Sequence, residues 1–231
     1  MQIPLPVSLP DDASFDAFFP HAGVAASLSA LQSGLVAPPL RALLHGAPGS
    51  GRTHLLQACG LAAEEQAAAF AYLPLADLRA LPPTELLAGL EACALVCLDD
   101  LDAVLGEPAW EEAIFHLHNR LLQREVSLLV AARLPPASLA VRLPDLLSRL
   151  QALLVLPLAL PDDESLLSAL VLRAHRRGMT LDEDVARYIL SRAPRGMSEL
   201  MAVLDLLDAR SLAAGRRLSI PFVREALGWQ A

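Results

Sequence analysis

A glycine-rich stretch reads Gly46-Ala47-Pro48-Gly49-Ser50-Gly51-Arg52-Thr53, between a short apolar run at 40–45 and an alanine- and leucine-rich segment without proline at 53–69. It matches the P-loop pattern GxxxxGK[ST] at every fixed position except Arg52, where the pattern has lysine. The glycines allow successive backbone N–H groups to approach phosphate oxygens at the N-terminus of a helix. The sequence therefore predicts a buried strand, a phosphate-binding loop and a helix, in that order.

Apolar runs and helical patterns alternate on either side of this loop. Short, almost continuously apolar runs predict buried strands at 40–45, 70–75, 94–98, 126–132 and 153–156. Helices are predicted between them at 53–69, 84–91, 110–124 and 144–150. This alternation predicts a three-layer α/β domain with a parallel sheet.

The pattern changes after Pro161, where three amphipathic helices are predicted at 162–177, 182–193 and 198–214. Two of them begin at an aspartate in a favourable capping position. Residues 2–12 contain three prolines and predict an extended tail. We therefore expect a tail at 1–12, an α/β domain at 13–159 and a small all-helical lid domain at 160–231.

The composition excludes several classes of protein. The formal net charge is −8 and all 18 basic residues are arginine, which argues against a dedicated DNA-binding domain because DNA binding needs basic residues to neutralise phosphates. The richest apolar run, 150–160, is interrupted and too short to span a membrane. No basic residue precedes Arg41, so no secretory signal is expected, and the predicted location is cytoplasmic. The cysteines lack zinc spacing and are interpreted as core thiols.

An apolar run ending in acids, Leu95-Val96-Cys97-Leu98-Asp99-Asp100, resembles a Walker B segment. Asp99 is expected to hold Mg²⁺ together with Thr53. In active ATPases of this kind a glutamate usually follows, and Asp100 is one methylene shorter, so it is only a weak candidate base. Asp102 is interpreted as a solvated loop charge.

The predicted ligand is ADP or ATP with Mg²⁺. Arg52 leaves two interpretations open, because a guanidinium is larger and flatter than an ammonium. It is either a harmless replacement in a chain without lysine, or the mark of a site that holds a diphosphate but positions a γ-phosphate poorly. The candidate nucleotide-binding residues are Gly46, Gly49, Ser50, Gly51, Arg52, Thr53 and His54.

Four further stretches narrow the choice among families of P-loop proteins. They are Phe15-Asp16-Ala17-Phe18, the helix at 110–120, Leu143-Pro144-Asp145-Leu146-Leu147-Ser148-Arg149-Leu150, and Ile220-Pro221-Phe222-Val223-Arg224-Glu225. Together with the P-loop they make the chain similar to the Hda family of DnaA-related AAA+ proteins. The resemblance covers nearly the whole chain and stops where DnaA would continue into its DNA-binding domain.

The resemblance implies a function in replication control. Proteins of this family bind the DNA polymerase sliding clamp and promote hydrolysis of the ATP bound to DnaA, which inhibits re-initiation of DNA replication. It implies that Arg149 is an arginine finger acting on the nucleotide of a neighbouring subunit. The alternative for Arg149 is a surface ion pair with Asp145, one helical turn earlier. A homodimer or homo-oligomer is compatible with the resemblance.

The tail gives an independent indication of a partner. The sequence Gln2-Ile3-Pro4-Leu5-Pro6-Val7 resembles the hexapeptide clamp-binding motif, approximately QLxLPL. In this interpretation Gln2 hydrogen-bonds to the clamp, while Ile3, Leu5 and Val7 fill apolar pockets. The alternative is an ordinary proline-rich arm.

Several positions depart from an active ATPase. Arg133 stands where the first sensor would be small and polar or acidic, and Ser198 stands where the second sensor arginine is expected. Arg195 is either a substitute for that arginine or a solvated residue. With Arg52 and Asp100 these departures predict weak intrinsic ATP hydrolysis. Two rival functions remain open: an autonomous AAA+ ATPase or loader-like motor, and a nucleotide-binding adaptor that stimulates no hydrolysis.

Overall fold

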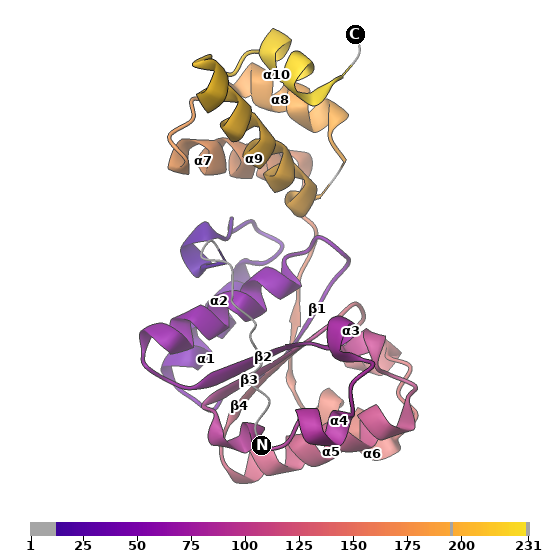
Figure 1. Ribbon diagram of the computed structural model, residues 1–231. Helices are drawn as coiled ribbons and strands as arrows, with labels where there is room; N and C mark the ends of the chain where they lie inside the picture. Colours follow the sequence, from indigo (N-terminus) through magenta and orange to yellow (C-terminus); the bar gives the residue numbers. More distant parts are fainter. Residues whose placement is uncertain (1–12, 195, 230–231) are drawn as a thin grey trace. The chain divides into compact units, whose positions relative to one another are not determined.

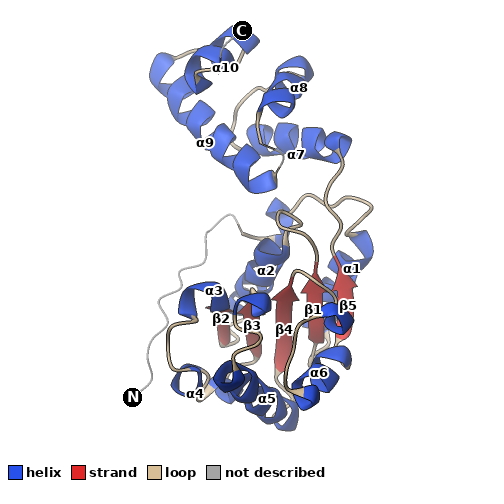
Figure 2. Cartoon of the chain, turned by 90° about the vertical axis from the view of Figure 1, so that its right-hand side faces the viewer, coloured by secondary structure: helices blue, strands red, loops and turns tan. Residues whose placement is uncertain are grey.

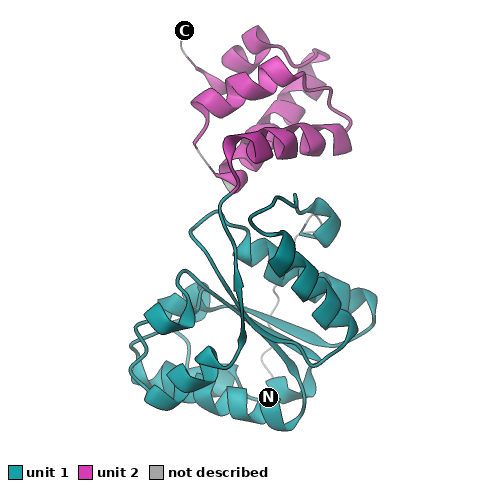
Figure 3. Ribbon diagram, turned by 180° about the vertical axis from the view of Figure 1, so that it is seen from behind, with its two compact units in different colours: residues 1–160 teal, residues 161–231 magenta. Residues whose placement is uncertain are grey.

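The computed structural model describes residues 13–194 and 196–229, apart from the side chain of Ser198. The chain divides into two compact units, the first ending at Leu160 and the second beginning at Pro161 (Figure 3). Among the described residues, no helix is both long enough and apolar enough to cross a membrane.

The first unit is built on a five-stranded parallel sheet with the order β2-β3-β4-β1-β5 (Figure 2). The strands are β1 (Arg41–His45), β2 (Phe70–Pro74), β3 (Leu95–Asp99), β4 (Ser127–Ala132) and β5 (Leu154–Pro157). Leu43 of β1 lies opposite Val130 of β4, and Cys97 of β3 lies opposite Leu129. Each strand lies within a residue or two of its predicted position, and the predicted α/β fold with a parallel sheet is confirmed.

Helices cover both faces of the sheet because alternate strand residues point to opposite sides. Ala42, Leu44 and Cys97 join one core with α1 (Ala25–Val36) and α2 (Arg52–Glu65). Leu43, Val96 and Val130 join the other core. That core is completed by α4 (Pro83–Leu86), α5 (Pro108–Gln123) and α6 (Pro144–Gln151), on the opposite side of the sheet in Figure 1.

Four parts of the first unit differ from the prediction. Helix α2 ends at Glu65, four residues before its predicted end at 69. The helix predicted at 84–91 was wrong: α4 ends at Leu86, and a 3₁₀ turn, η2 (Leu90–Ala92), follows Gly89, whose φ of +78° favours glycine. The strand predicted at 70–75 stops at Pro74, and Leu75 begins α3 (Leu75–Leu78). Helix α1 was not predicted. The remaining 3₁₀ turns are η1 (Phe15–Ala17), η3 (Leu101–Ala103) and η4 (Pro136–Ser138).

The second unit is all-helical, as predicted, with α7 (Asp163–Arg176), α8 (Glu183–Arg192), α9 (Met197–Ala214) and α10 (Ile220–Leu227). Asp162 caps α7, because its Oδ1 accepts a hydrogen bond from the Ser165 N–H at 2.8 Å. Asp182 precedes α8 but makes no such bond. Leu170, Ile189, Leu204 and Phe222 join the four helices in one apolar core.

Candidate functional site

The glycine-rich loop connects β1 to α2 at the carboxyl edge of the sheet. Gly49 and Gly51 have φ angles of +83° and +90°, a backbone region that side chains rarely adopt. Gly46 packs so closely on the Leu158 carbonyl and the Ser50 side chain that a Cβ there would collide with both. These three glycines are therefore required by the loop itself, in the conformation that precedes the N-terminus of α2.

The segment before α1 packs on this loop. The Phe18 ring lies so near Gly51 that a Cβ on the glycine would meet it at 2.6 Å. The same ring lies 5.5 Å from the ring of His54, measured between centroids. His54 Nε2 is 2.9 Å from the carbonyl oxygen of Ser14. His54, predicted to contact nucleotide, thus holds the N-terminal segment against the first turn of α2.

The Arg52 side chain turns away from solvent toward the acids that follow β3. One guanidinium nitrogen, Nη2, lies 3.8 Å from Asp100 Oδ1, and Nη1 lies 4.0 Å from Asp102 Oδ2. The residue is only 8% exposed, and the buried Nη1 has no hydrogen-bond partner. Arg52 is therefore a buried cation with one unsatisfied donor group, and such a group lowers the stability of the fold.

Asp99, at the end of β3, is 2% exposed, and each of its carboxylate oxygens accepts a hydrogen bond. Its Oδ2 accepts a hydrogen bond from the Tyr72 hydroxyl at 2.7 Å, and its Oδ1 accepts one from the Asp100 N–H at 2.9 Å. Burial, and then the Asp99 charge, raise the pKa of Tyr72 well above its ordinary value, so its hydroxyl remains a donor. Burial, followed by Asp99, also raises the pKa of Asp100, although Arg52 and Arg133 partly oppose this.

Asp102 is not the solvated loop charge that we predicted. Its Oδ2 accepts a hydrogen bond from the Arg133 backbone N–H at 2.7 Å, and its side chain is only 20% exposed. Through Asp102 the loop after β3 is joined to the loop after β4. The site therefore contains three acids, balanced by the side chains of Arg52 and Arg133.

The acids at this edge do not fit the predicted magnesium site. Mg²⁺ requires oxygen ligands in near-ideal octahedral geometry. Both oxygens of Asp99 already accept hydrogen bonds, and the Arg52 guanidinium occupies the space beside Asp100 and Asp102. Thr53 is exposed in the first turn of α2, whereas Asp99 is buried at the end of β3.

Arg149 lies in the last turn of α6 and is exposed. Within the described part of the chain, no ion pair joins it to Asp145, so the surface pair that we considered is not formed. Arg149 and Arg41 both lie close enough to His118 of α5 to lower its pKa. The Arg41 Nε is buried without a hydrogen-bond partner. In the described part of the chain, neither arginine is paired with a carboxylate, and both charges act on His118.

Glu111 of α5 is a structural residue that the sequence reasoning missed. It is 1% exposed, and its carboxylate accepts hydrogen bonds from the backbone N–H groups of Gly106, Arg142 and Leu143 at 2.7–3.1 Å. Arg142 and Leu143 lead directly into α6. Glu111 therefore fixes the start of the helix that carries Arg149.

His118 should make the stability of the first unit depend on pH. It is 7% exposed, and burial, followed by Arg149 and Arg41, lowers its pKa. Folding lowers the pKa of this histidine below its value of about 6.5 in the unfolded chain. The free energy of unfolding is therefore highest above about pH 6.5, and it falls at lower pH because the unfolded chain binds the proton more readily. We expect the free energy of unfolding to fall more between pH 7.5 and 5.5 for the wild type than for His118→Gln, by chemical denaturation. Equal losses in both proteins would contradict this.

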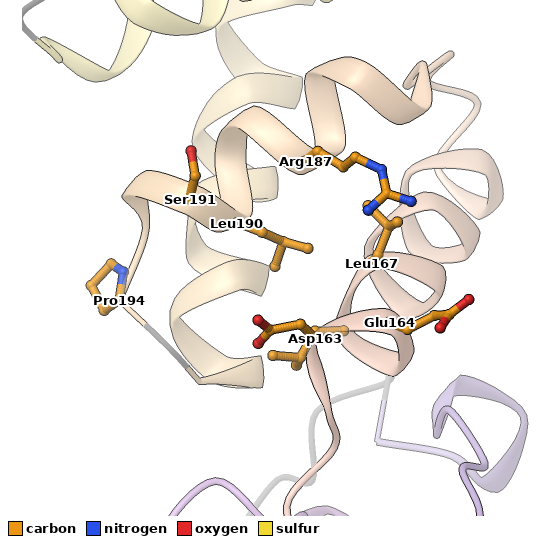
Figure 4. Close-up of a pocket in the computed structure, with 8 residues that line it drawn as sticks. Asp163, Glu164, Leu167, Arg187, Leu190, Ser191 and Pro194 are labelled. Carbon is orange, nitrogen blue, oxygen red and sulfur yellow. The ribbon is translucent and has the colours of Figure 1, made fainter.

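A pocket of about 470 Å³ lies in the second unit between α7 and α8 (Figure 4). It combines an apolar floor with acids from the first turn of α7, and its lining residues are Asp163, Glu164, Leu166, Leu167, Arg187, Leu190, Ser191 and Pro194. It contains none of the residues predicted to bind nucleotide. We assign it no role in the nucleotide site.

Some predicted residues are not placed by the structure. The tail residues Gln2, Ile3, Leu5 and Val7 and the sensor candidate Arg195 lie outside the described residues. Ser198 lies in the first turn of α9, but its side chain is not described.

Comparisons with known proteins agree with this architecture. The structure matches domain III of the replication initiation protein DnaA from Thermotoga maritima with a TM-score of 0.82, at 21% identity over 96% of this chain and 98% of that one. Residues 162–227 match the family model for the lid domain of Hda. The chain therefore has the fold of DnaA domain III, and its second unit is similar to the lid domain of Hda.

The chain also matches two larger proteins. AMPPCP-bound DnaA from Aquifex aeolicus has a TM-score of 0.74 at 20% identity, over 89% of this chain and 68% of that one. The Thermotoga maritima RuvB Holliday junction branch migration motor has a TM-score of 0.66 at 19% identity, over 95% and 72%. At such identities the likeness establishes the fold alone, and the predicted resemblance to Hda is supported for the lid at residues 162–227.

Proposed function

We propose that this protein is a regulator of replication initiation that binds the DNA polymerase sliding clamp and promotes hydrolysis of ATP bound to DnaA. The observation that carries the proposal is the exposed Arg149 on a DnaA-like domain followed by an Hda lid. An arginine finger must reach the nucleotide of another subunit, which requires a guanidinium that is not already paired. Arg149 meets that requirement, since among the described residues it is exposed and no ion pair joins it to Asp145.

The protein's own nucleotide site has a different role in this proposal. The glycines of the P-loop support binding of ADP or ATP through backbone N–H groups. Hydrolysis requires a group that orients the attacking water, and Asp100 is poorly suited because its carboxylate faces the Arg52 guanidinium. We therefore propose that ADP binds at least as well as ATP and that the protein hydrolyses ATP slowly.

The clamp interaction is assigned to the tail. Replacing Gln2 and Leu5 together with alanine should weaken clamp binding about thirtyfold, because one hydrogen-bonding anchor and one apolar pocket filler are lost. Surface plasmon resonance on immobilised clamp measures this change, and a Ser8→Ala variant provides a control within the same tail. Undiminished binding by the double variant would show that the motif is not the contact.

One experiment separates the proposed function from its two rivals. Phosphate release from ATP is measured for this protein alone, for DnaA alone, and for both with clamp loaded on DNA. The proposal predicts slow release by each protein alone and rapid release by the complete mixture. Rapid release by this protein alone would favour an autonomous ATPase, and unchanged release in the mixture would favour an adaptor.

A further inference from the structure

We infer that the Arg52 guanidinium takes the place of the divalent cation at this P-loop, so that a nucleoside diphosphate binds without magnesium. The inference rests on the proposed nucleotide function and concerns the cation at that same site. It is carried by the position of Arg52, by its unsatisfied donor and by the state of Asp99.

Arg52 lies within reach of both the loop glycines and the acids that follow β3. It is the first residue of α2, directly after the loop glycines, yet its side chain reaches across to the acids at the end of β3. A metal ion in a P-loop joins phosphate oxygens to an acid at this point. In this protein a permanent positive charge already lies beside Asp100 and Asp102, so the acids have a cation that belongs to the chain.

Two buried donors without hydrogen-bond partners indicate that the guanidinium also binds an anion. Nη1 is buried without a hydrogen-bond partner in a residue that is 8% exposed. The Ser50 hydroxyl, two positions earlier in the same loop and 3% exposed, is also without one. Buried donors are normally satisfied. Two such groups in one phosphate-binding loop indicate that an anion completes both.

The chemistry of arginine allows both contacts at once. A guanidinium is planar and has five N–H donors, so one edge can face carboxylates while another faces a phosphate oxygen. A lysine ammonium is a compact point charge that cannot span both groups in this way. Arg52 can therefore bridge the diphosphate to Asp100 and Asp102, which is the connection that a metal would otherwise make.

The environment of Asp99 makes this residue, the remaining candidate ligand, a poor one for a metal ion. Tyr72 and the Asp100 N–H each donate to one of its oxygens. Asp99 is also 2% exposed, so a divalent ion would have to enter a buried position, and it would be repelled by the buried guanidinium. Magnesium binding is disfavoured on both counts.

The test measures the Kd for ADP by isothermal titration calorimetry of the full chain. The titration is done at equal ionic strength, once with saturating Mg²⁺ and once with excess EDTA. The wild type should bind ADP no more than about threefold more weakly in EDTA, which is less than a tenfold step in Kd. Arg52→Lys, which restores the usual P-loop residue, should bind at least about tenfold more weakly in EDTA than in Mg²⁺. Wild-type binding that is more than threefold weaker in EDTA would overturn the inference.

A second measurement does not depend on the variant folding. Electron paramagnetic resonance with Mn²⁺, at ADP concentrations equal to those of the wild-type protein, should show no Mn²⁺ bound to the complex beyond that bound to ADP alone. A bound Mn²⁺ signal specific to the complex would overturn the inference while leaving nucleotide binding intact. Failure of the wild type to bind ADP in either buffer would instead overturn the proposed nucleotide function, and the inference with it.

Discussion

Arg149→Ala is expected to fold, to bind ADP and the clamp like the wild type, and to lose almost all stimulation of ATP hydrolysis by DnaA. Arginine fingers contribute about 10³–10⁵ to the rate in other nucleotide hydrolases, so we expect a loss of about 10³-fold or more. The reason is that no other exposed cation in the last turn of α6 replaces the guanidinium. Phosphate release with DnaA and DNA-loaded clamp measures the effect.

The matched control is Arg187→Ala, which also removes an exposed arginine. Arg187 lies in α8 and pairs with Glu183 one turn away, a surface ion pair that contributes little to stability. It should stimulate DnaA as the wild type does. Equal stimulation by Arg149→Ala and Arg187→Ala would show that Arg149 is not the finger.

Glu111→Ala is expected to lower the free energy of unfolding by about 3–5 kcal/mol. The variant leaves the buried N–H groups of Gly106, Arg142 and Leu143 without their acceptor, and each such loss costs about 1–3 kcal/mol. Equilibrium denaturation in urea measures the change. Since two of these groups precede α6, the surviving folded protein should also stimulate DnaA less well.

The neighbouring glutamate provides the control for this prediction. Glu112 lies on the exposed side of the same helix, where its Oε1 is 3.7 Å from His116 Nε2, with side chains 73% and 58% exposed. Glu112→Ala should change the free energy of unfolding by less than about 1 kcal/mol. A loss below about 1 kcal/mol for Glu111→Ala as well would contradict the assigned role of its carboxylate.

The sheet and the P-loop could be predicted because their signals are local. Each strand in the middle of the sheet is buried on both faces, so its sequence is a short apolar run whatever lies around it. The loop requires glycine at Gly49 and Gly51 for its own backbone, and this requirement is visible in the sequence. Helix α1 gave a weaker signal, because Ala25–Val36 has no charged residue and no side-chain cap at its start.

The roles of individual acids could not be predicted because they depend on distant partners. Asp102 receives its hydrogen bond from Arg133, which is 31 positions away, and Glu111 receives two of its bonds from residues 31 and 32 positions away. One signal was available for Glu111, since it stands beside Trp110 and three residues before Ile114, on the mainly apolar side of the helix. For Arg52 the sequence left two interpretations open, and only its position beside Asp100 and Asp102 favours a functional one.

The central claim is that this protein causes DnaA to hydrolyse its own bound ATP. The most direct measurement loads DnaA with radiolabelled ATP, removes free nucleotide, and follows conversion to ADP on DNA-loaded clamp with and without this protein. The account predicts rapid conversion only when this protein and the clamp are both present, with Arg149 intact. Label that remains ATP in the complete mixture at the rate of DnaA alone would contradict it.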